Sequence, residues 1–107
     1  MPINEMNEIE ELKDSFVKDL VPLKIYLFGS FAEGKQGEGS DYDFYIIVNN
    51  FEKDILGLTA RAYRAIRHKQ KRSVDIIVNT EENFEKRKDF SASVEKEVNQ
   101  KGVLLYG

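Results

Sequence analysis

The sequence KIYLFGSFAEGKQGEGSDYDFYIIV, residues 24–48, places a polar, glycine-rich segment between two apolar ones. The flanking segments, Lys24 to Phe28 and Tyr42 to Asn49, are rich in β-branched and aromatic residues, which predicts two strands. The segment between them holds four of the seven glycines of the chain and ends on two aspartates one residue apart. Glycine directly after a buried strand allows a sharp turn and the close approach of a ligand.

The rest of the chain predicts helices around a third strand. Apolar residues at helical spacing predict a helix that Asn4 caps and Pro22 ends, and another from Phe51 to about His68. The segment SVDIIVN, residues 73–79, predicts the third strand. Further helices are expected over residues 80–84, capped by Thr80, and over residues 91–99, stopped by Gly102; VLLY, residues 103–106, is expected to pack as an apolar tail.

Composition limits the class of protein. With 107 residues the chain is expected to form a single domain, residues 1–107, whose α/β (α+β) fold is a mixed sheet flanked by helices. The absence of cysteine excludes disulfides and thiolate metal sites, and a single histidine, His68, excludes a histidine-rich one. Without a membrane-spanning apolar run or a signal-like N-terminus, we expect a cytoplasmic protein. Any metal is then bound by carboxylates, which favour hard ions such as Mg²⁺.

The start of the loop has the residues of a phosphate-binding turn. Gly29 follows a strand and Ser30 stands where a helix would begin, so that free N–H groups and a hydroxyl could face a phosphate. An ordinary strand–turn–helix with a capping serine would have the same sequence.

Three aspartates form a second pattern. Asp41 and Asp43 share one face of a strand, about 6.6 Å apart along it, and would repel unless a cation lies between them. A pair of magnesium ions is the usual solution in phosphoryl chemistry. Asp75 interrupts another apolar strand. Instead of binding metal, Asp41 and Asp43 could be two solvated acids at the end of a strand. Asp75 could form a salt bridge with a lysine or arginine.

Together these residues resemble the minimal nucleotidyltransferase family of the DNA polymerase β superfamily, whose pattern is GS, about ten residues, D-x-D, and a later acid on a neighbouring strand. The resemblance implies a nucleotidyltransferase-type mixed sheet and magnesium-dependent transfer of a nucleoside monophosphate, AMP from ATP or another NTP, to an acceptor hydroxyl. It implies that Gly29 and Ser30, with Ser40 before the acid pair, bind the nucleotide. Asp41, Asp43 and Asp75 would be the catalytic residues and the ligands of two Mg²⁺ ions.

The resemblance also implies a partner. Minimal members resemble the antitoxin half of a toxin–antitoxin pair, in which the acceptor is a tyrosine on a helical HEPN toxin. The alternative is a catalytically weak antitoxin-like module that acts by contact. Glu33 favours it, because many family members carry an arginine there and a carboxylate would repel a triphosphate; Lys35 is a candidate replacement for that arginine. The basic block Arg61 to Arg72 could contact RNA or an acidic partner, or be a solvated helix end. Nucleic acid is not favoured, because the net charge is −3.

Overall fold

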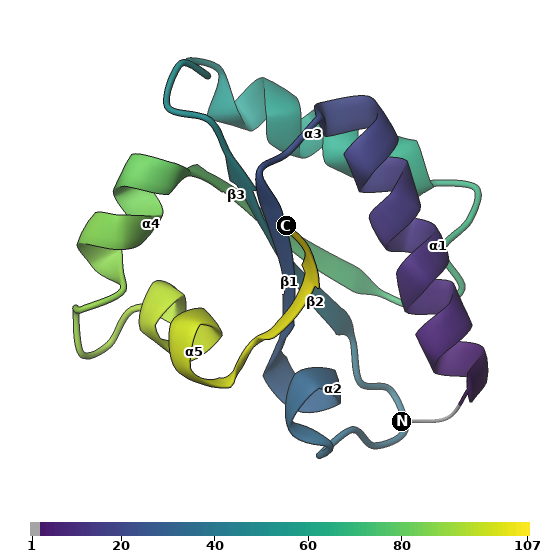
Figure 1. Cartoon of the computed structure of the whole chain (residues 1–107). Helices are drawn as coiled ribbons and strands as arrows, with labels where there is room; N and C mark the ends of the chain where they lie inside the picture. The colour runs from purple at the N-terminus through teal and green to yellow at the C-terminus, as the bar shows by residue number, and fades with distance from the viewer. Residues whose placement is uncertain (1–2) are drawn as a thin grey trace.

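The computed structural model describes residues 3–107 as four strands and five helices (Figure 1). In chain order the elements are α1 (Ile3–Leu20), β1 (Lys24–Phe28), α2 (Gly29–Glu33), β2 (Tyr42–Val48), α3 (Ile55–Ile66), β3 (Val74–Thr80), α4 (Glu81–Arg87), α5 (Val94–Lys101) and β4 (Val103–Tyr106). Within this range no helix combines the length and the apolar character needed to cross a membrane.

The four strands form one mixed sheet in the order β3-β2-β1-β4. β1 pairs antiparallel with both β2 and β4, whereas β2 and β3 run parallel. The parallel pairing requires a crossover connection, which α3 supplies. The predicted mixed sheet flanked by helices is therefore confirmed.

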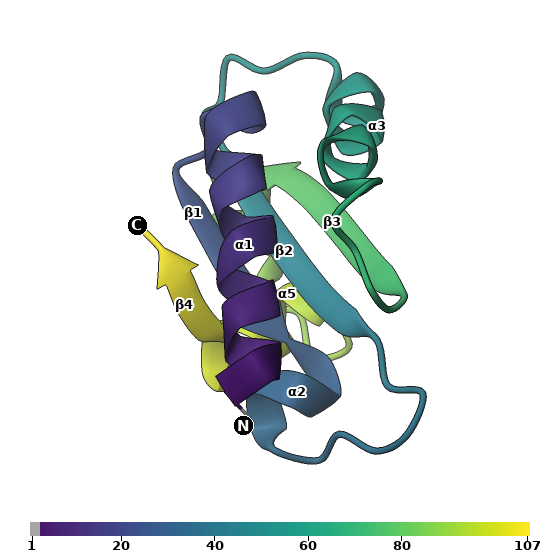
Figure 2. The same cartoon turned by 90° about the vertical axis from the view of Figure 1, so that its right-hand side faces the viewer.

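Helices cover both faces of the sheet: α1 and α3 lie on one side, α4 and α5 on the other (Figures 1 and 2). The alternation of side chains along β2 divides its residues between two cores. Tyr42, Phe44, Ile46 and Val48 join the larger core beneath α1 and α3. The smaller core, beneath α4 and α5, consists of Phe28, Tyr45, Ile47, Phe84 and Val98. The acidic residues of β2 and β3 share this second face.

Several element boundaries differ from the prediction. Asn4 lies inside α1 rather than capping it. α3 begins only at Ile55, because the Asp54 side chain accepts a hydrogen bond from the Gly57 N–H and caps the helix there. Thr80 caps α4 as predicted, although that helix continues to Arg87.

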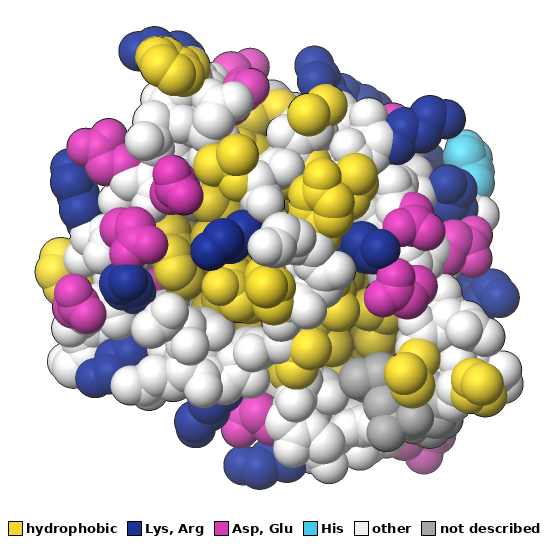
Figure 3. Space-filling view, in the orientation of Figure 1, with side chains coloured by type: hydrophobic (Ala, Val, Ile, Leu, Met, Phe, Trp, Pro, Cys, Tyr) yellow, Lys and Arg dark blue, Asp and Glu magenta, His cyan; other side chains and the backbone are white. Residues whose placement is uncertain are grey.

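Residues 103–106 are a strand and not the expected apolar tail. β4 hydrogen-bonds to the free edge of β1, and three of its four side chains stay exposed, at 43% for Val103, 48% for Leu104 and 38% for Tyr106. The prediction was wrong because a short, uniformly apolar run has no periodicity that distinguishes a strand from a packed coil. Figure 3 shows hydrophobic side chains gathered across the middle of the face that β4 crosses in Figure 1.

The turn from β1 into α2 depends on Gly29. Its φ of +76° lies in the left-handed region, which other residues adopt at a cost. A Cβ added to Gly29 would lie 2.2 Å from Oδ2 of Asp43, so the carboxylate of Asp43 rests directly against the glycine. The turn is thus shaped by two independent requirements, one conformational and one steric.

We expect Gly29→Ala to destabilise the protein more than Gly34→Ala does. Both glycines have a positive φ, but a Cβ at Gly34 would meet nothing within 4 Å. Gly34→Ala should therefore cost only backbone strain, about 1–2 kcal/mol. Gly29→Ala adds the displacement of the Asp43 side chain. Urea unfolding of both variants measures the difference, and equal losses would show that the contact with Asp43 is relieved without cost.

Candidate functional site

Asp43 and Asp75 meet on neighbouring strands. The parallel register of β2 and β3 pairs Asp43 with Asp75, and both side chains project on the α4–α5 face. On the other side of β2, Asp43 pairs with Phe28, the last residue of β1. The turn at Gly29 and the two carboxylates therefore lie at the same end of the sheet.

The electrostatics of Asp43 reflect this crowding. Burial, the negative charges of Asp75 and Asp41, a hydrogen bond with Asp75 and the charge of Glu97 together raise the pKa of Asp43 from its usual 3.8 to about 6. Burial disfavours the charged form of Asp43, whereas the negative charges around it would also attract a metal cation.

Asp75 and Asp41 are the other two predicted acids, but the three carboxylates do not gather into one metal site in the described part of the chain. Asp75 is exposed and does not take part in the ion pairs found among residues 3–107, so the salt-bridge alternative finds no support there. Asp41 stands just before β2, half-buried, where its charge acts on Asp43. In the described part of the chain no three His, Cys, Asp or Glu side chains are gathered as a metal site. The structure thus brings together two of the three predicted ligands.

The two carboxylates that meet have the chemistry of a hard-cation site. They present oxygen ligands from rigid strands, and they repel one another in the absence of a positive charge. A divalent cation such as Mg²⁺ fits this donor pair, with the remaining ligands drawn from Asp41, water or substrate phosphates.

The loop that carries Asp41 is held by Arg72. The guanidinium of Arg72 lies 4.9 Å from the ring centre of Phe31 and 5.0 Å from that of Tyr42. It also donates a hydrogen bond of 3.1 Å to the carbonyl of Ser40. Arg72 therefore joins α2, the loop and β2, so this member of the basic block is a structural clamp and not a free surface charge.

Ser40 closes the same loop from within. Its hydroxyl accepts a hydrogen bond of 2.8 Å from the Gly37 N–H, and its own N–H donates to the Gly37 carbonyl at 3.1 Å. These two bonds brace the loop just before Asp41. Ser30 differs from the alternative of a capping serine, because α2 already begins at Gly29 and its N-cap residue is Phe28, without a side-chain cap.

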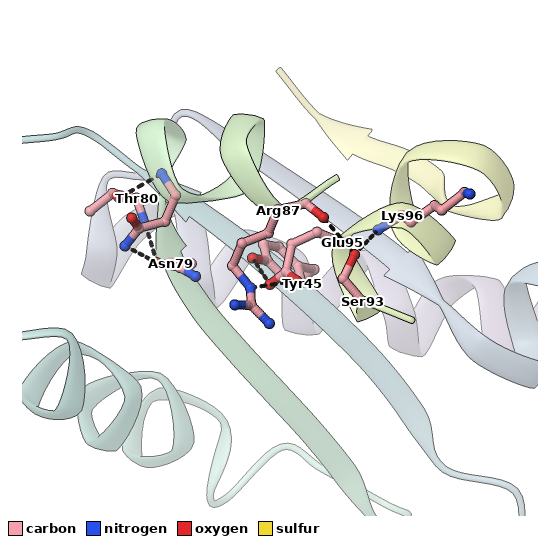
Figure 4. Close-up of polar contacts among 8 residues, drawn as sticks. Tyr45, Asn79, Thr80, Arg87, Ser93, Glu95 and Lys96 are labelled. Carbon is pink, nitrogen blue, oxygen red and sulfur yellow. Dashed lines mark hydrogen bonds and ion pairs between the residues drawn. The ribbon is translucent and has the colours of Figure 1, made fainter. Parts of the chain in front are cut away.

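A buried polar network fixes α5 beside the acids (Figure 4). Glu95, only 3% exposed, accepts a hydrogen bond of 2.6 Å from the Tyr45 hydroxyl and one of 3.0 Å from Nε of Arg87. Burial acts to raise the pKa of Glu95, but the hydrogen bonds from Tyr45, the backbone and Arg87 outweigh it and lower that pKa. Ser93 caps α5 by accepting from the Lys96 N–H at 3.0 Å. The network links α5 to β2 and α4.

Glu33 does not present an unopposed negative charge. Its Oε1 lies 3.5 Å from Nζ of Lys35 and 3.9 Å from Nζ of Lys101, and its side chain is 21% exposed. Lys35, the candidate replacement for the missing arginine, thus pairs with Glu33 itself. Sequence reasoning missed Lys101 and Glu95, and it gave Arg72 only as part of the basic block. Glu95 had a signal, since it interrupts the apolar face that Val94 and Val98 form on α5.

The raised pKa of Asp43 predicts a specific dependence of stability on pH. Between pH 3.8 and about 6 the folded protein retains a proton that the unfolded chain releases, so this group lowers stability as the pH rises through that window. Asp43→Asn removes the titration and keeps the size of the side chain. We expect the variant to melt a few degrees above the parent at pH 7.5 and close to it at pH 4.5.

Differential scanning fluorimetry without added metal measures both melting temperatures. Asp19→Asn is the control, because Asp19 is an exposed acid near the end of α1. A gain from Asp43→Asn that is equal at both pH values would contradict the raised pKa.

Comparisons with known proteins agree with this geometry. The sequence profile of the nucleotidyltransferase domain family matches residues 9–104. A search of curated proteins found no match. Among solved structures, a candidate nucleotidyltransferase from Sulfolobus solfataricus is similar at 24% identity and a TM-score of 0.63, over 95% of this chain and 79% of that one. A toxin–antitoxin complex with AMP-PNP is similar at 24% identity and a TM-score of 0.56, over 92% of this chain and 73% of that one.

A mutant of the toxin–antitoxin MntA–HpeT is also similar, at 23% identity and a TM-score of 0.51, again over 92% of this chain and 73% of that one. At these identities the structures bear on the fold alone. The profile match covers most of the chain and includes β1 to β3 with the turn and the acids that they carry. The chain therefore belongs to the nucleotidyltransferase domain family.

Proposed function

We propose that the protein transfers a nucleoside monophosphate, AMP from ATP, to an acceptor hydroxyl in a magnesium-dependent reaction. The observation that carries the proposal is the register of Asp43 with Asp75, beside a turn whose glycine touches Asp43. Membership of the nucleotidyltransferase domain family supports the reaction class. The nucleotide, the metal and the acceptor are parts of the proposal.

The residues of the chain would act mainly by positioning. Asp43, Asp75 and Asp41 would hold two Mg²⁺ ions, which supply positive charge to the transferred phosphoryl group. Gly29, which has no side chain between the turn and Asp43, and Ser30, in the first turn of α2, would bind the phosphates. Ser40 keeps the loop closed so that Asp41 stays near β2.

The chemical step conserves atoms and charge in a simple way. The acceptor oxygen forms a bond to the α-phosphorus of ATP, and the bond from that phosphorus to the bridging oxygen breaks, which releases pyrophosphate. The hydroxyl proton passes to Asp75, whose exposed carboxylate is open to an incoming acceptor. No oxidant or further reactant is needed.

The acceptor is proposed to belong to a partner protein. Two similar structures are of toxin–antitoxin complexes, one of them with AMP-PNP. A tyrosine of a helical HEPN toxin would be presented to the exposed carboxylate of Asp75. The alternative remains a contact-only antitoxin, although two lysines near Glu33 partly offset the negative charge that favours it.

Asp75→Asn should separate binding from chemistry. We expect the variant to bind Mg²⁺–ATP with nearly the parent affinity and to transfer AMP at least about a hundredfold more slowly, because Asp75 acts on the acceptor. Asp43→Asn should lose both, since its carboxylate faces phosphate and metal. Calorimetry measures the affinity, and labelled ATP incubated with cell lysate measures transfer.

Asp19→Asn serves again as the exposed control. If Asp75→Asn weakens ATP binding as much as it slows transfer, Asp75 acts mainly as a ligand of the metal in the ground state and its role toward the acceptor is overturned. If the parent fails to bind Mg²⁺–ATP at millimolar concentration, the transferase function is overturned and the contact-only module replaces it.

A further inference from the structure

A groove of about 300 Å³ runs along α5, the helix that the polar network fixes beside the acids. Its polar lining includes Ser93, Lys96, Glu97, Gln100 and Lys101. Glu97 is the residue of this lining whose charge reaches Asp43. The groove therefore presents two lysines, Lys96 and Lys101, along α5.

Packing places the end of this groove beside the turn at Gly29. Val98 of α5 and Phe28 of β1 belong to the same core. Lys101 follows Val98 by one helical turn, and Gly29 follows Phe28 directly. Glu33, one turn further along α2, then reaches Lys101 with its Oε1 3.9 Å from Nζ. The two short helices thus converge where a polyphosphate beside Gly29 would lie.

α5 is held at both of its ends. At the N-terminal end, Glu95 is buried and bonded to Tyr45 and Arg87. At the C-terminal end, Lys101 pairs with Glu33, which also pairs with Lys35. Asp43 is also acidic and rests against Gly29, so the two lysines that pair with Glu33 supply positive charge on this side of the turn. Glu33 is therefore placed to orient cations there rather than only to repel an anion.

We propose that Lys101 contacts the terminal phosphates of the nucleoside triphosphate and that Glu33 is the positioning residue that holds it there. The inference rests on the proposed function for the nucleotide, but the polyphosphate contact can be tested without transfer. In this chain the cation comes from the end of α5, opposite the acidic residue of α2. Lys35, more exposed than Lys101 at 74% against 59%, would contribute mainly long-range charge.

A double-mutant cycle distinguishes positioning from simple repulsion. Two charges that act on a ligand independently give additive effects, whereas a residue that holds another gives a coupling. If Glu33 positions Lys101, then Lys101→Met should weaken binding more when Glu33 is present than in the Glu33→Gln background. If Glu33 only repels phosphate, Lys101→Met should weaken binding equally in both backgrounds.

The experiment measures binding of Mg²⁺–tripolyphosphate and Mg²⁺–AMP-PNP by calorimetry at low ionic strength. We expect Lys101→Met to weaken both about fivefold, and about twofold or less in the Glu33→Gln background. Lys101→Arg should restore most of the affinity, since it keeps the charge. The loss should shrink as salt is added.

Lys86→Met and Glu82→Gln provide the matched control. Lys86 and Glu82 form an exposed pair on α4 at 3.2 Å, so the same charges are removed away from the turn. These variants should change affinity little and show no coupling. Thermal melts confirm that all variants fold, which separates loss of a contact from loss of structure.

The possible results distinguish failure of the Lys101 contact, of the Glu33 role and of the proposed reaction. Equal losses in the two backgrounds would overturn the positioning role of Glu33, and an affinity unchanged by Lys101→Met would overturn the contact. Binding of tripolyphosphate with the expected coupling, but without transfer of AMP, would support this inference while the proposed reaction fails. A parent protein that binds neither probe would overturn both.

Discussion

The constraint on which the site depends is the alignment of two like charges on parallel strands. β2 and β3 are parallel, and their register sets Asp43 beside Asp75. Each aspartate belongs to a strand whose neighbouring residues lie in a core, so the backbone holds the two positions side by side. Burial raises the pKa of Asp43 most, and the negative charge of Asp75 raises it further. A cation bound between the two carboxylates would offset the repulsive part of this cost.

The two faces of the sheet differ in role: one carries the larger core and the other carries the candidate site. The α1–α3 side contains the larger core, including the fully buried Phe16 and Phe44, whose rings meet edge to face at 5.1 Å. The α4–α5 side contains the smaller core and the polar residues that surround Asp43. An acidic cluster next to a small core is tolerable because the larger core, on the opposite face, contributes most of the buried apolar surface.

Much of the fold could be predicted from local pattern. The three longer strands and the amphipathic helices have clear periodicities, and the position of Asp43 in a strand follows from the apolar residues around it, although Asp41 lies just before that strand. The pairing of Asp43 with Asp75 could be anticipated only through the family pattern, because the register of two parallel strands depends on how α3 packs. The local sequence indicates which residues are candidates for the chemistry, but it does not determine the strand register that brings them together.

The features that escaped prediction all depend on contacts between distant segments. Arg72 lies between two aromatic rings from α2 and β2, and nothing near Arg72 in the sequence indicates this. Lys101 reaches Glu33 only because Val98 and Phe28 share a core. Residues 103–106 form a strand because they pair with the open edge of β1, whereas VLLY has no alternating pattern that predicts a strand. In each case the contact depends on a segment that is distant in the sequence.

The pairing of β4 with β1 also has a kinetic consequence. β1 meets one neighbour, β2, soon after it in the chain, and the other, β4, only after every other element has been passed. Closing so long a loop is entropically costly and is repaid late in folding, when most other contacts already exist. On this argument the central strand β1, which ends at Phe28, acquires its second partner late. Until β4 pairs with it, one edge of β1 stays open, while β2 already covers the other.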